Sequence, residues 1–579
     1  MKKNKNIFRI LFSTIIFLLY SCETVDLNQT ENRSGVSVDL LDPVLTFNYV
    51  QLQLPDFVDS ANSFTQRVTR QMAMTGGNTY DNAFAPVNSN ANWSTGYNIL
   101  NAIKLMEPKA IEKQEFYALG ASKVIRVYVL MTLVDLYGDI PYTDALQGND
   151  NLTPKYDNSA FVYTQLLSEI DQAIVVLGKV NFKDSKIKDL YYSSQASWIT
   201  LANTLKFKIY NNARLAGTDI GISDIGLKMN EIISGGNYID QKSEDFAFKY
   251  GNSRFTPNTR HPLYNDQYET GGGAYIANHF MWAMTTEKGF STNYAPNTDP
   301  RTFFYFCKQE SKPINEDEFT LPGKNRARPD HFNDSKYQSL YITGNNGRTP
   351  FVISNWTNGK IDDGFWGRDH GDNSGIPPDS DKRTVAGIYP IGGKFTTSEG
   401  SVQTGGNKGA LGAGIMPILL SSYVNFMIAE ASSTVPGFID SGRARSQFEL
   451  GINASIDKAT NLIQGYPVLS LGDQTILNNN KISYPAFMLL KYDAATSVGK
   501  LEIIMKEYYL ACWGNGIEPY NNYRRTGFPS NFQPTVEPIS GDYYYTALYA
   551  GTSVNNNPNT PSNLRSRKVF WDKANIILH

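Results

Sequence analysis

The chain has 579 residues, which is long enough for a large core or for several domains. Its formal net charge of −2 leaves no electrostatic footprint for nucleic acid, so the composition excludes a nucleic-acid-binding protein. Three cysteines are too few for a disulfide scaffold, and the five scattered histidines lack the paired spacing of a zinc site.

The N-terminus has the three parts of an export signal. Lysines come first, and the apolar stretch 7–19 that follows is shorter than the ~20 residues needed to cross a bilayer. The sequence LYSC at positions 19–22 places a small residue before a cysteine and resembles the bacterial lipobox. We therefore expect residues 1–21 to be a signal peptide, with acyl chains on Cys22 that anchor the polar tether 22–45. An ordinary cleaved signal with a chance cysteine is the alternative interpretation.

Helical periodicity dominates both ends of the remaining chain. Within residues 46–245, the segment 124–138 is apolar almost all round, which predicts a central buried helix. Residues 246–410 are rich in Gly, Asn, Pro, Ser and Thr, which predicts long loops with short strands or turns. The helical pattern returns over 411–579, where residues 501–513 place apolar side chains on one face. The sequence therefore predicts two helical parts with a loop-rich region between them.

No catalytic motif is complete in this sequence. The Gly-Gly-Lys at 392–394 lacks both the earlier glycine and the following Ser or Thr of a phosphate-binding loop. Oxygen ligands in the segment 367–381 could hold calcium, but a turn-rich loop is the better interpretation, so we expect no metal and no cofactor. Cys307 and Cys512 could pair in an oxidising compartment, and the sequence does not settle whether they do. The aspartates of the acidic segment are Asp369, Asp372, Asp379 and Asp381.

Aromatic residues are abundant, at 13% of the chain with 35 tyrosines and 7 tryptophans. Tyr and Trp rings offer a flat apolar face with a polar edge. Such side chains suit a surface that stacks on the C–H faces of sugars. A large core also needs aromatic residues, so packing in the core is an alternative explanation to sugar binding.

Several segments spread over nearly the whole chain together resemble the SusD/RagB family of outer-membrane nutrient-binding lipoproteins of the Bacteroidetes. The most specific match combines YGDIPY at 137–142, directly after a helix, with WGNG and RRTGFP within 513–529. The matching segments are the lipobox at Cys22 and residues 126–146, 196–209, 299–306, 367–379, 416–431, 507–529 and 567–572.

This resemblance implies a mostly α-helical SusD-like fold over residues 46–579, with four diverged tetratricopeptide-like helix pairs and a large loop-rich insertion. It implies a non-catalytic, lipid-anchored lid exposed on the cell outer membrane. The lid would pair with a SusC-like TonB-dependent transporter and deliver captured oligosaccharide to it. The rival functions are a peptide-binding lid, a surface glycoside hydrolase and a purely structural scaffold whose loops bind protein.

Binding residues vary within the family, so no ligand-binding residue transfers by motif. We expect aromatic rings in loops to contact the ligand, with packing in the core or at a hinge as the alternative for each ring. Trp198 and Trp513 lie at helical core spacing and are expected to be structural. The predicted ligand-binding residues are Trp93, Tyr97, Tyr268, Tyr275, Trp282, Phe365 and Trp366.

Overall fold

The structure is a computed structural model, and the chain divides into the units Met1–Asp42 and Pro43–His579, the second of which holds all described helices and strands. Cys22, Phe365, Trp366 and the four aspartates of the acidic segment lie outside the described residues. The described residues are 41–74, 84–179, 187–270, 274–288, 298–307, 367–368, 370–371, 383–394, 396–397, 400–401, 409–462, 471–533 and 543–574.

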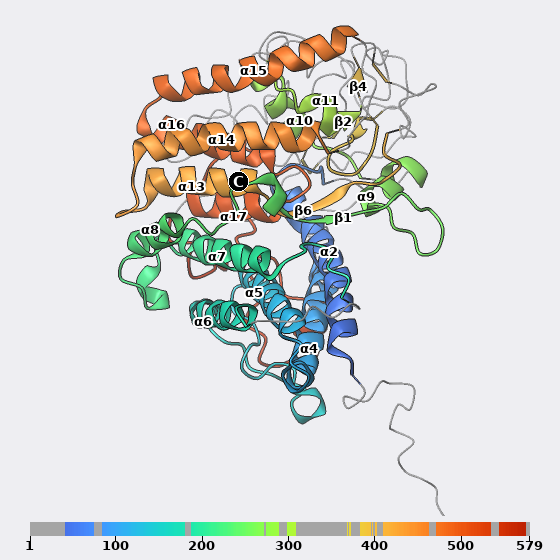
Figure 1. The fold of residues 1–579 in the computed structure, drawn as a ribbon, viewed down its shortest axis with the longest axis vertical. Helices are drawn as coiled ribbons and strands as arrows, with labels where there is room; N and C mark the ends of the chain where they lie inside the picture. Colours follow the sequence, from blue (N-terminus) through green and yellow to red (C-terminus); the bar gives the residue numbers. More distant parts are fainter. Residues whose placement is uncertain are drawn as a thin grey trace, which may run out of the picture. The chain divides into compact units, whose positions relative to one another are not determined.

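The first helical part is a run of helices in which each packs on the next (Figure 1). Polar side chains cap three helix starts: Asn158 accepts hydrogen bonds from the first turn of α6, Ser194 from that of α7 and Asp224 from that of α8. The helices are α2 (Pro43–Val68), α4 (Asn90–Glu112), α5 (Phe116–Tyr137), α6 (Ser159–Leu177), α7 (Gln195–Asn212) and α8 (Ile225–Gly235).

Helix α5 is the buried centre that the sequence predicted. Both α5 and α6 are long and apolar enough to cross a membrane by length and composition alone. In α5, 89% of the most apolar stretch is buried inside the protein, where the helix packs against α4, α6 and α7. In α6 the buried residues, such as Val162, Leu166 and Ile170, recur at helical spacing and form one face. Packing within the fold therefore accounts for the composition of α5 and of this face of α6.

The second helical part pairs α13 with α14 and packs α16 against α13 and α17. It joins the first part where α17 packs on α2. Gly516, at the start of α17, makes this approach possible, because a Cβ there would lie 2.4 Å from the backbone nitrogen of Gln66. The helices are α13 (Ser421–Thr434), α14 (Ser441–Thr460), α15 (Leu471–Ala494), α16 (Ser497–Ala511), α17 (Ile517–Thr526) and α18 (Gly551–Asn556).

Short elements fill the described residues between the two helical parts. Strand β1 (Phe246–Lys249) pairs antiparallel with β6 (Ile415–Leu419), β2 (Phe306–Cys307) with β3 (Val385–Ala386), and β4 (Thr396–Thr397) with β5 (Gly400–Ser401). The helical elements here are α9 (Pro262–Tyr264), the π-helix η7 (Asn265–Glu269), α10 (Asn278–Met284), the 3₁₀-helix η8 (Thr286–Lys288) and α11 (Thr302–Tyr305). The predicted mostly α fold, with helix pairs on either side of a loop-rich region, is confirmed.

Buried charges join distant parts of this helical frame. Arg525 of α17 donates to both carboxylate oxygens of Glu430 in α13, at 2.7 and 2.5 Å. Burial disfavours the charged form of Glu430, but Arg525 outweighs it, so the pKa of Glu430 lies below its usual value. Lys208 of α7 is 2.6 Å from a carboxylate oxygen of Glu518. The first pair joins two helices of the second helical part, and the second pair connects the first helical part to the second.

Candidate ligand-binding pocket

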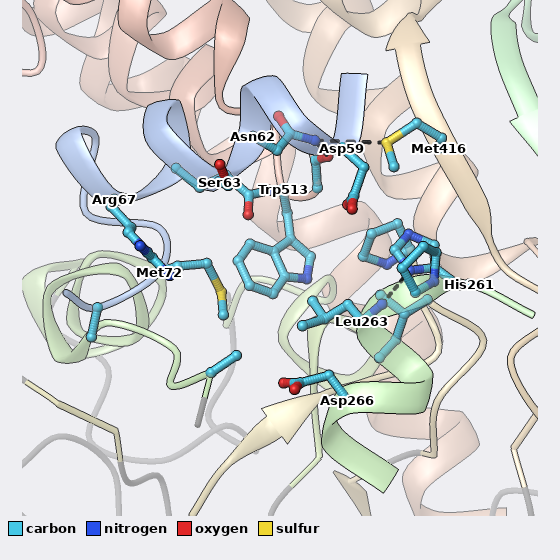
Figure 2. A pocket seen from close by; sticks show the side chains of 17 residues that line it. Asp59, Asn62, Ser63, Arg67, Met72, His261, Leu263, Asp266, Met416 and Trp513 are labelled. Carbon is cyan, nitrogen blue, oxygen red and sulfur yellow. Dashed lines mark hydrogen bonds between the residues drawn. The ribbon is translucent and has the colours of Figure 1, made fainter. Parts of the chain in front are cut away.

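A pocket of about 530 Å³ opens between the C-terminal half of α2, the segment 261–266 and the turn after α16 (Figure 2). We call it the α2 pocket. Its polar lining residues come from parts of the chain that are about 200 to 250 residues apart in sequence. The lining residues are Asp59, Asn62, Ser63, Gln66, Arg67, Met72, Ala73, His261, Pro262, Leu263, Asp266, Ala274, Pro390, Ile391, Met416, Trp513 and Gly514.

Helix α2 presents a polar face to the pocket. Its lining residues within 59–67 recur at intervals of three, one, three and one, which places them along one side of an α-helix. Buried residues such as Phe57, Val58 and Val68 lie at other positions of the helix, in the core. The same helix therefore packs in the core and supplies the polar wall of the pocket.

The segment from His261 to Asp266 forms another wall. Burial lowers the pKa of His261 to about 3, so this imidazole is neutral at physiological pH. Its Nδ1 accepts a hydrogen bond from the backbone N–H of Leu263 at 3.1 Å, which assigns the proton to Nε2. Asp266 follows on η7, with its side chain along the lower side of the pocket in the view of Figure 2. This wall thus contributes one acidic group and no cationic group.

Trp513 lies centrally in the pocket in Figure 2, on the turn between α16 and α17. Asn62 of α2 holds this turn: its Nδ2 donates to the carbonyl oxygen of Gly514 at 3.0 Å, and its Oδ1 accepts from the N–H of Gly516 at 2.9 Å. Gly514 has φ +92, a conformation that side chains with a Cβ rarely adopt. The indole itself is 1% exposed and stacks on Phe280 at 5.0 Å.

Two buried polar atoms in the α2 pocket have no hydrogen-bond partner among the described residues: Trp513 Nε1 and Asp266 Oδ2. One is a donor and the other an acceptor. Leaving such a buried group unpaired costs ~1–3 kcal/mol. A polar ligand in the pocket would recover part of that free energy by pairing with either atom.

The carboxyl group of Asp59 has a raised pKa of about 6, because burial disfavours its charged form and the nearby Asp56 adds repulsion. Arg67, at the other end of this face of α2, is exposed. Across the described ranges, no three His, Cys, Asp or Glu side chains form a cluster that could hold a metal ion. The side chains that line the pocket offer hydrogen bonding, charge and apolar contact.

Two of the predicted ligand-binding rings line a second, smaller hollow of about 220 Å³ between α4, the segment 141–154 and α18. Trp93 is 9% exposed, and its ring lies 5.0 Å from that of Tyr97. The hydroxyl of Tyr97 donates to the carbonyl oxygen of Pro141 at 2.8 Å. The structure thus brings Trp93 and Tyr97 together, away from the residues that line the α2 pocket.

The other three described rings are not among the residues that line the α2 pocket. Tyr268 is half-buried, stacks on Tyr264 at 4.9 Å and donates its hydroxyl to the carbonyl oxygen of Ala386. Tyr275 and Trp282 are buried, and neither is among the residues that line the pocket. Contact between these rings and a ligand stays a prediction.

Cys307 and Cys512 are both buried, and they form no disulfide bond. Burial raises the pKa of the Cys307 thiol to about 11 and also raises that of Cys512. The two thiols are therefore protonated at neutral pH. The sequence left open whether these two cysteines pair, and in the structure they do not.

Sequence reasoning missed the polar lining of the α2 pocket. The signal in the sequence was the run of polar residues at helical spacing within 59–67, which by itself is equally typical of a solvated helix face. Trp513 was assigned to the core, which its burial confirms, yet its indole N–H also lines the pocket. Only the packing of the described segments shows that these side chains share one site.

Several solved structures share this fold across nearly the whole chain. A SusD/RagB family protein from Bacteroides thetaiotaomicron aligns with a TM-score of 0.62 at 16% identity, covering 92% of this chain and 99% of that one. A SusD homolog from Bacteroides fragilis aligns with a TM-score of 0.59 at 16% identity, covering 92% and 99%. A chitin-binding SusD homolog from Flavobacterium johnsoniae gives 0.54 at 17% identity, covering 91% and 97%. At these identities the similarity establishes the fold.

Comparison with curated protein sequences finds no match. Comparison with family models does find one: the SusD-like family, described as "starch-binding associating with outer membrane", matches residues 33–356 and 378–542. These two ranges cover most of the chain, including α2, η7 and the turn that carries Trp513. The chain therefore belongs to the SusD-like family.

Proposed function

We propose that this protein captures an oligosaccharide in the α2 pocket and delivers it to a SusC-like TonB-dependent transporter in the outer membrane. The observation that carries this proposal is the pair of unpartnered atoms in the pocket, Trp513 Nε1 and Asp266 Oδ2. A sugar hydroxyl is both a donor and an acceptor, so a carbohydrate can satisfy both atoms. The family description and the chitin-binding homolog support a glycan as the ligand.

The size and lining of the pocket fit this ligand class. A volume of about 530 Å³ lies within the range of small-molecule sites, which is ~300–1,000 Å³. Met72, Leu263 and Met416 add apolar surface between the polar groups. Apolar surface beside hydrogen-bonding groups suits a pyranose ring, which has C–H faces and a polar rim.

The proposed role is capture without chemistry. A surface glycoside hydrolase is the rival, and the two carboxyl groups of Asp59 and Asp266 are the ones in this pocket that such an enzyme would use. Incubation with the glycan that binds most tightly separates the two functions. Release of shorter products in proportion to enzyme concentration would establish hydrolysis in place of capture.

The binding site is tested with Trp513→Phe, which keeps a ring and removes the N–H donor. We expect glycan affinity, measured by calorimetry with maltoheptaose and chitohexaose, to fall ~2–10-fold, because one hydrogen bond contributes ~0.5–1.5 kcal/mol. Tyr97→Ala, in the second hollow, is the matched control and should leave affinity unchanged. Unchanged affinity in Trp513→Phe together with a loss in Tyr97→Ala would move the site to the second hollow.

The anchor is tested by replacing Cys22. We expect Cys22→Ala to release the protein from the outer-membrane fraction, because its acyl chains would be lost. Quantitative blotting of membrane and soluble fractions measures the change. Retention of the variant in the membrane fraction would contradict the lipid anchor and leave glycan capture unaffected.

A further inference from the structure

The charged groups around the α2 pocket are unevenly distributed. Asp59 and Asp266 line it as half-buried carboxyl groups. Arg67 is the one cationic side chain among its described lining residues, and it is exposed. His261 is buried and neutral, because burial lowers its pKa to about 3. Asp56, one turn of α2 before Asp59, adds negative charge close by.

Burial decides which of these charges a ligand feels. Partial burial lowers the pKa of Arg67, but its side chain is more exposed than the two half-buried carboxyl groups, so solvent and salt screen its interactions more strongly. The potential inside the pocket is therefore negative. A second acidic group on a ligand would be repelled here, and a cationic group would be attracted.

The carboxyl groups also have hydrogen-bonding capacity that the described residues do not use. Within the described residues, Asp59 has no ion-pair partner, and Asp266 Oδ2 is buried without a hydrogen-bond partner. Carboxylate oxygens only accept hydrogen bonds. A hydroxyl or an ammonium group can donate to them, whereas a carboxylate or sulfate group on a sugar cannot. The buried donor that faces the pocket is the Trp513 N–H, which a neutral hydroxyl oxygen can satisfy.

We infer that the α2 pocket selects glycans by charge, binding amine-bearing sugars most tightly, neutral sugars less tightly, and excluding glycans that carry carboxylate or sulfate groups. This inference rests on the proposed function, because it assumes that the pocket holds a glycan. It concerns Asp59 and Asp266 as the residues that set the specificity. Each carboxylate that pairs with a ligand ammonium would strengthen binding through a charge-assisted hydrogen bond.

The test uses three hexasaccharides with one backbone: β-1,4-linked glucose, its glucosamine counterpart and its glucuronate counterpart. A second series on the α-1,4-linked glucose backbone covers the other glycan geometry. Calorimetry at neutral pH and low salt should give ~5–10-fold tighter binding for the amine than for the neutral sugar, and no binding for the uronate. The double variant Asp59→Asn/Asp266→Asn should bring the amine and neutral affinities to within ~2-fold of each other.

The matched control is Asp150→Asn/Asp171→Asn, which removes the same net charge from exposed positions on η4 (Gly148–Asp150) and α6. It should keep the wild-type order of affinities, because these charges are screened from the pocket. Two results would overturn this inference alone. One is that the glucuronate sugar binds as tightly as the neutral sugar. The other is that Asp59→Asn/Asp266→Asn still binds the amine sugar much more tightly than the neutral one. Absence of binding by every member of both series would overturn the proposed function and this inference together.

Discussion

The helical frame and the α2 pocket differ in how their charged side chains are paired. In the frame, buried charges meet partners: Arg525 meets Glu430, and Lys208 meets Glu518. In the pocket, the Trp513 N–H and one oxygen of Asp266 have no partner among the described residues. An unpaired buried group lowers stability, and a ligand in the pocket could pair with both of these atoms. This difference agrees with the binding role that we propose for the pocket.

The largest effect should come from breaking a buried pair of the frame. Arg525→Met removes the cation that donates to Glu430, leaving a fully buried carboxylate whose remaining partners are Arg214, 3.6 Å away, and a 3.3 Å hydrogen bond from Asn211. We expect a loss of ~3–5 kcal/mol in the free energy of unfolding, because an uncompensated charge stays buried. Urea denaturation followed by circular dichroism measures it.

The control for this variant is an exposed pair of the same kind. Lys242 and Asp457 lie 2.8 Å apart with both side chains nearly half exposed. Lys242→Met should change the free energy of unfolding by less than ~1 kcal/mol, since exposed ion pairs contribute little. Equal losses in Arg525→Met and Lys242→Met would show that burial does not set the contribution of these pairs.

A smaller effect should appear where frame and pocket meet, at Gly516. Gly516→Ala places a methyl group 2.4 Å from the backbone nitrogen of Gln66, so α2 and the start of α17 must separate. We expect a loss of ~1–3 kcal/mol in stability. Glycan binding should weaken as well, because Asn62 on α2 holds the turn that carries Trp513. Denaturation and calorimetry on one preparation measure both.

Gly235, the last residue of α8, provides the comparison. A Cβ at this position meets nothing within 4 Å, so Gly235→Ala should leave binding unchanged and stability equal or higher by up to ~1 kcal/mol. If Gly516→Ala also left both quantities unchanged, the close approach of α17 to α2 would have no part in shaping the pocket.

The contrast between frame and pocket also explains what the sequence could predict. Helix α5 was predicted because nearly every side chain in it is apolar, and that pattern is local. The loop-rich region was predicted from its Gly, Pro and Asn content, which is also local. The family resemblance rested on frame segments such as 513–529, which the structure places in the buried contact between α17 and α2.

The α2 pocket escaped prediction because its residues become neighbours only through tertiary packing. Asp59, Asp266 and Trp513 are separated by about 200 residues or more, and no periodicity connects them. The aromatic rings predicted from the sequence include Trp93 and Tyr97, which lie together but line the second hollow. Spacing within one helix is visible in a sequence, whereas the partner of that helix is not.

The smallest predicted effect is on the pH dependence of stability, and it comes from Asp59, whose carboxyl group carries an unpaired charge in the pocket. Its pKa is raised to about 6, against about 3.8 for an unperturbed aspartate, because burial and Asp56 disfavour the charged form. Between these two values the folded protein holds a proton that the unfolded chain has released. The stability that Asp59 gains from holding this proton in the folded state is therefore complete below about pH 3.8, and it is lost as the pH rises through 6.

Asp59→Asn removes this titration, so its stability relative to wild type should depend on pH. At pH values well above 6 the variant should be more stable on the order of 1 kcal/mol, since two pKa units would be ~3 kcal/mol and the group is partly solvated. The difference should shrink towards zero near pH 4. Urea midpoints across this range measure it, and Asp171→Asn on α6 should show no such trend. A constant difference at every pH would mean that Asp59 is solvated as fully as a surface carboxylate, and would remove it from the negative potential that the pocket presents to a glycan.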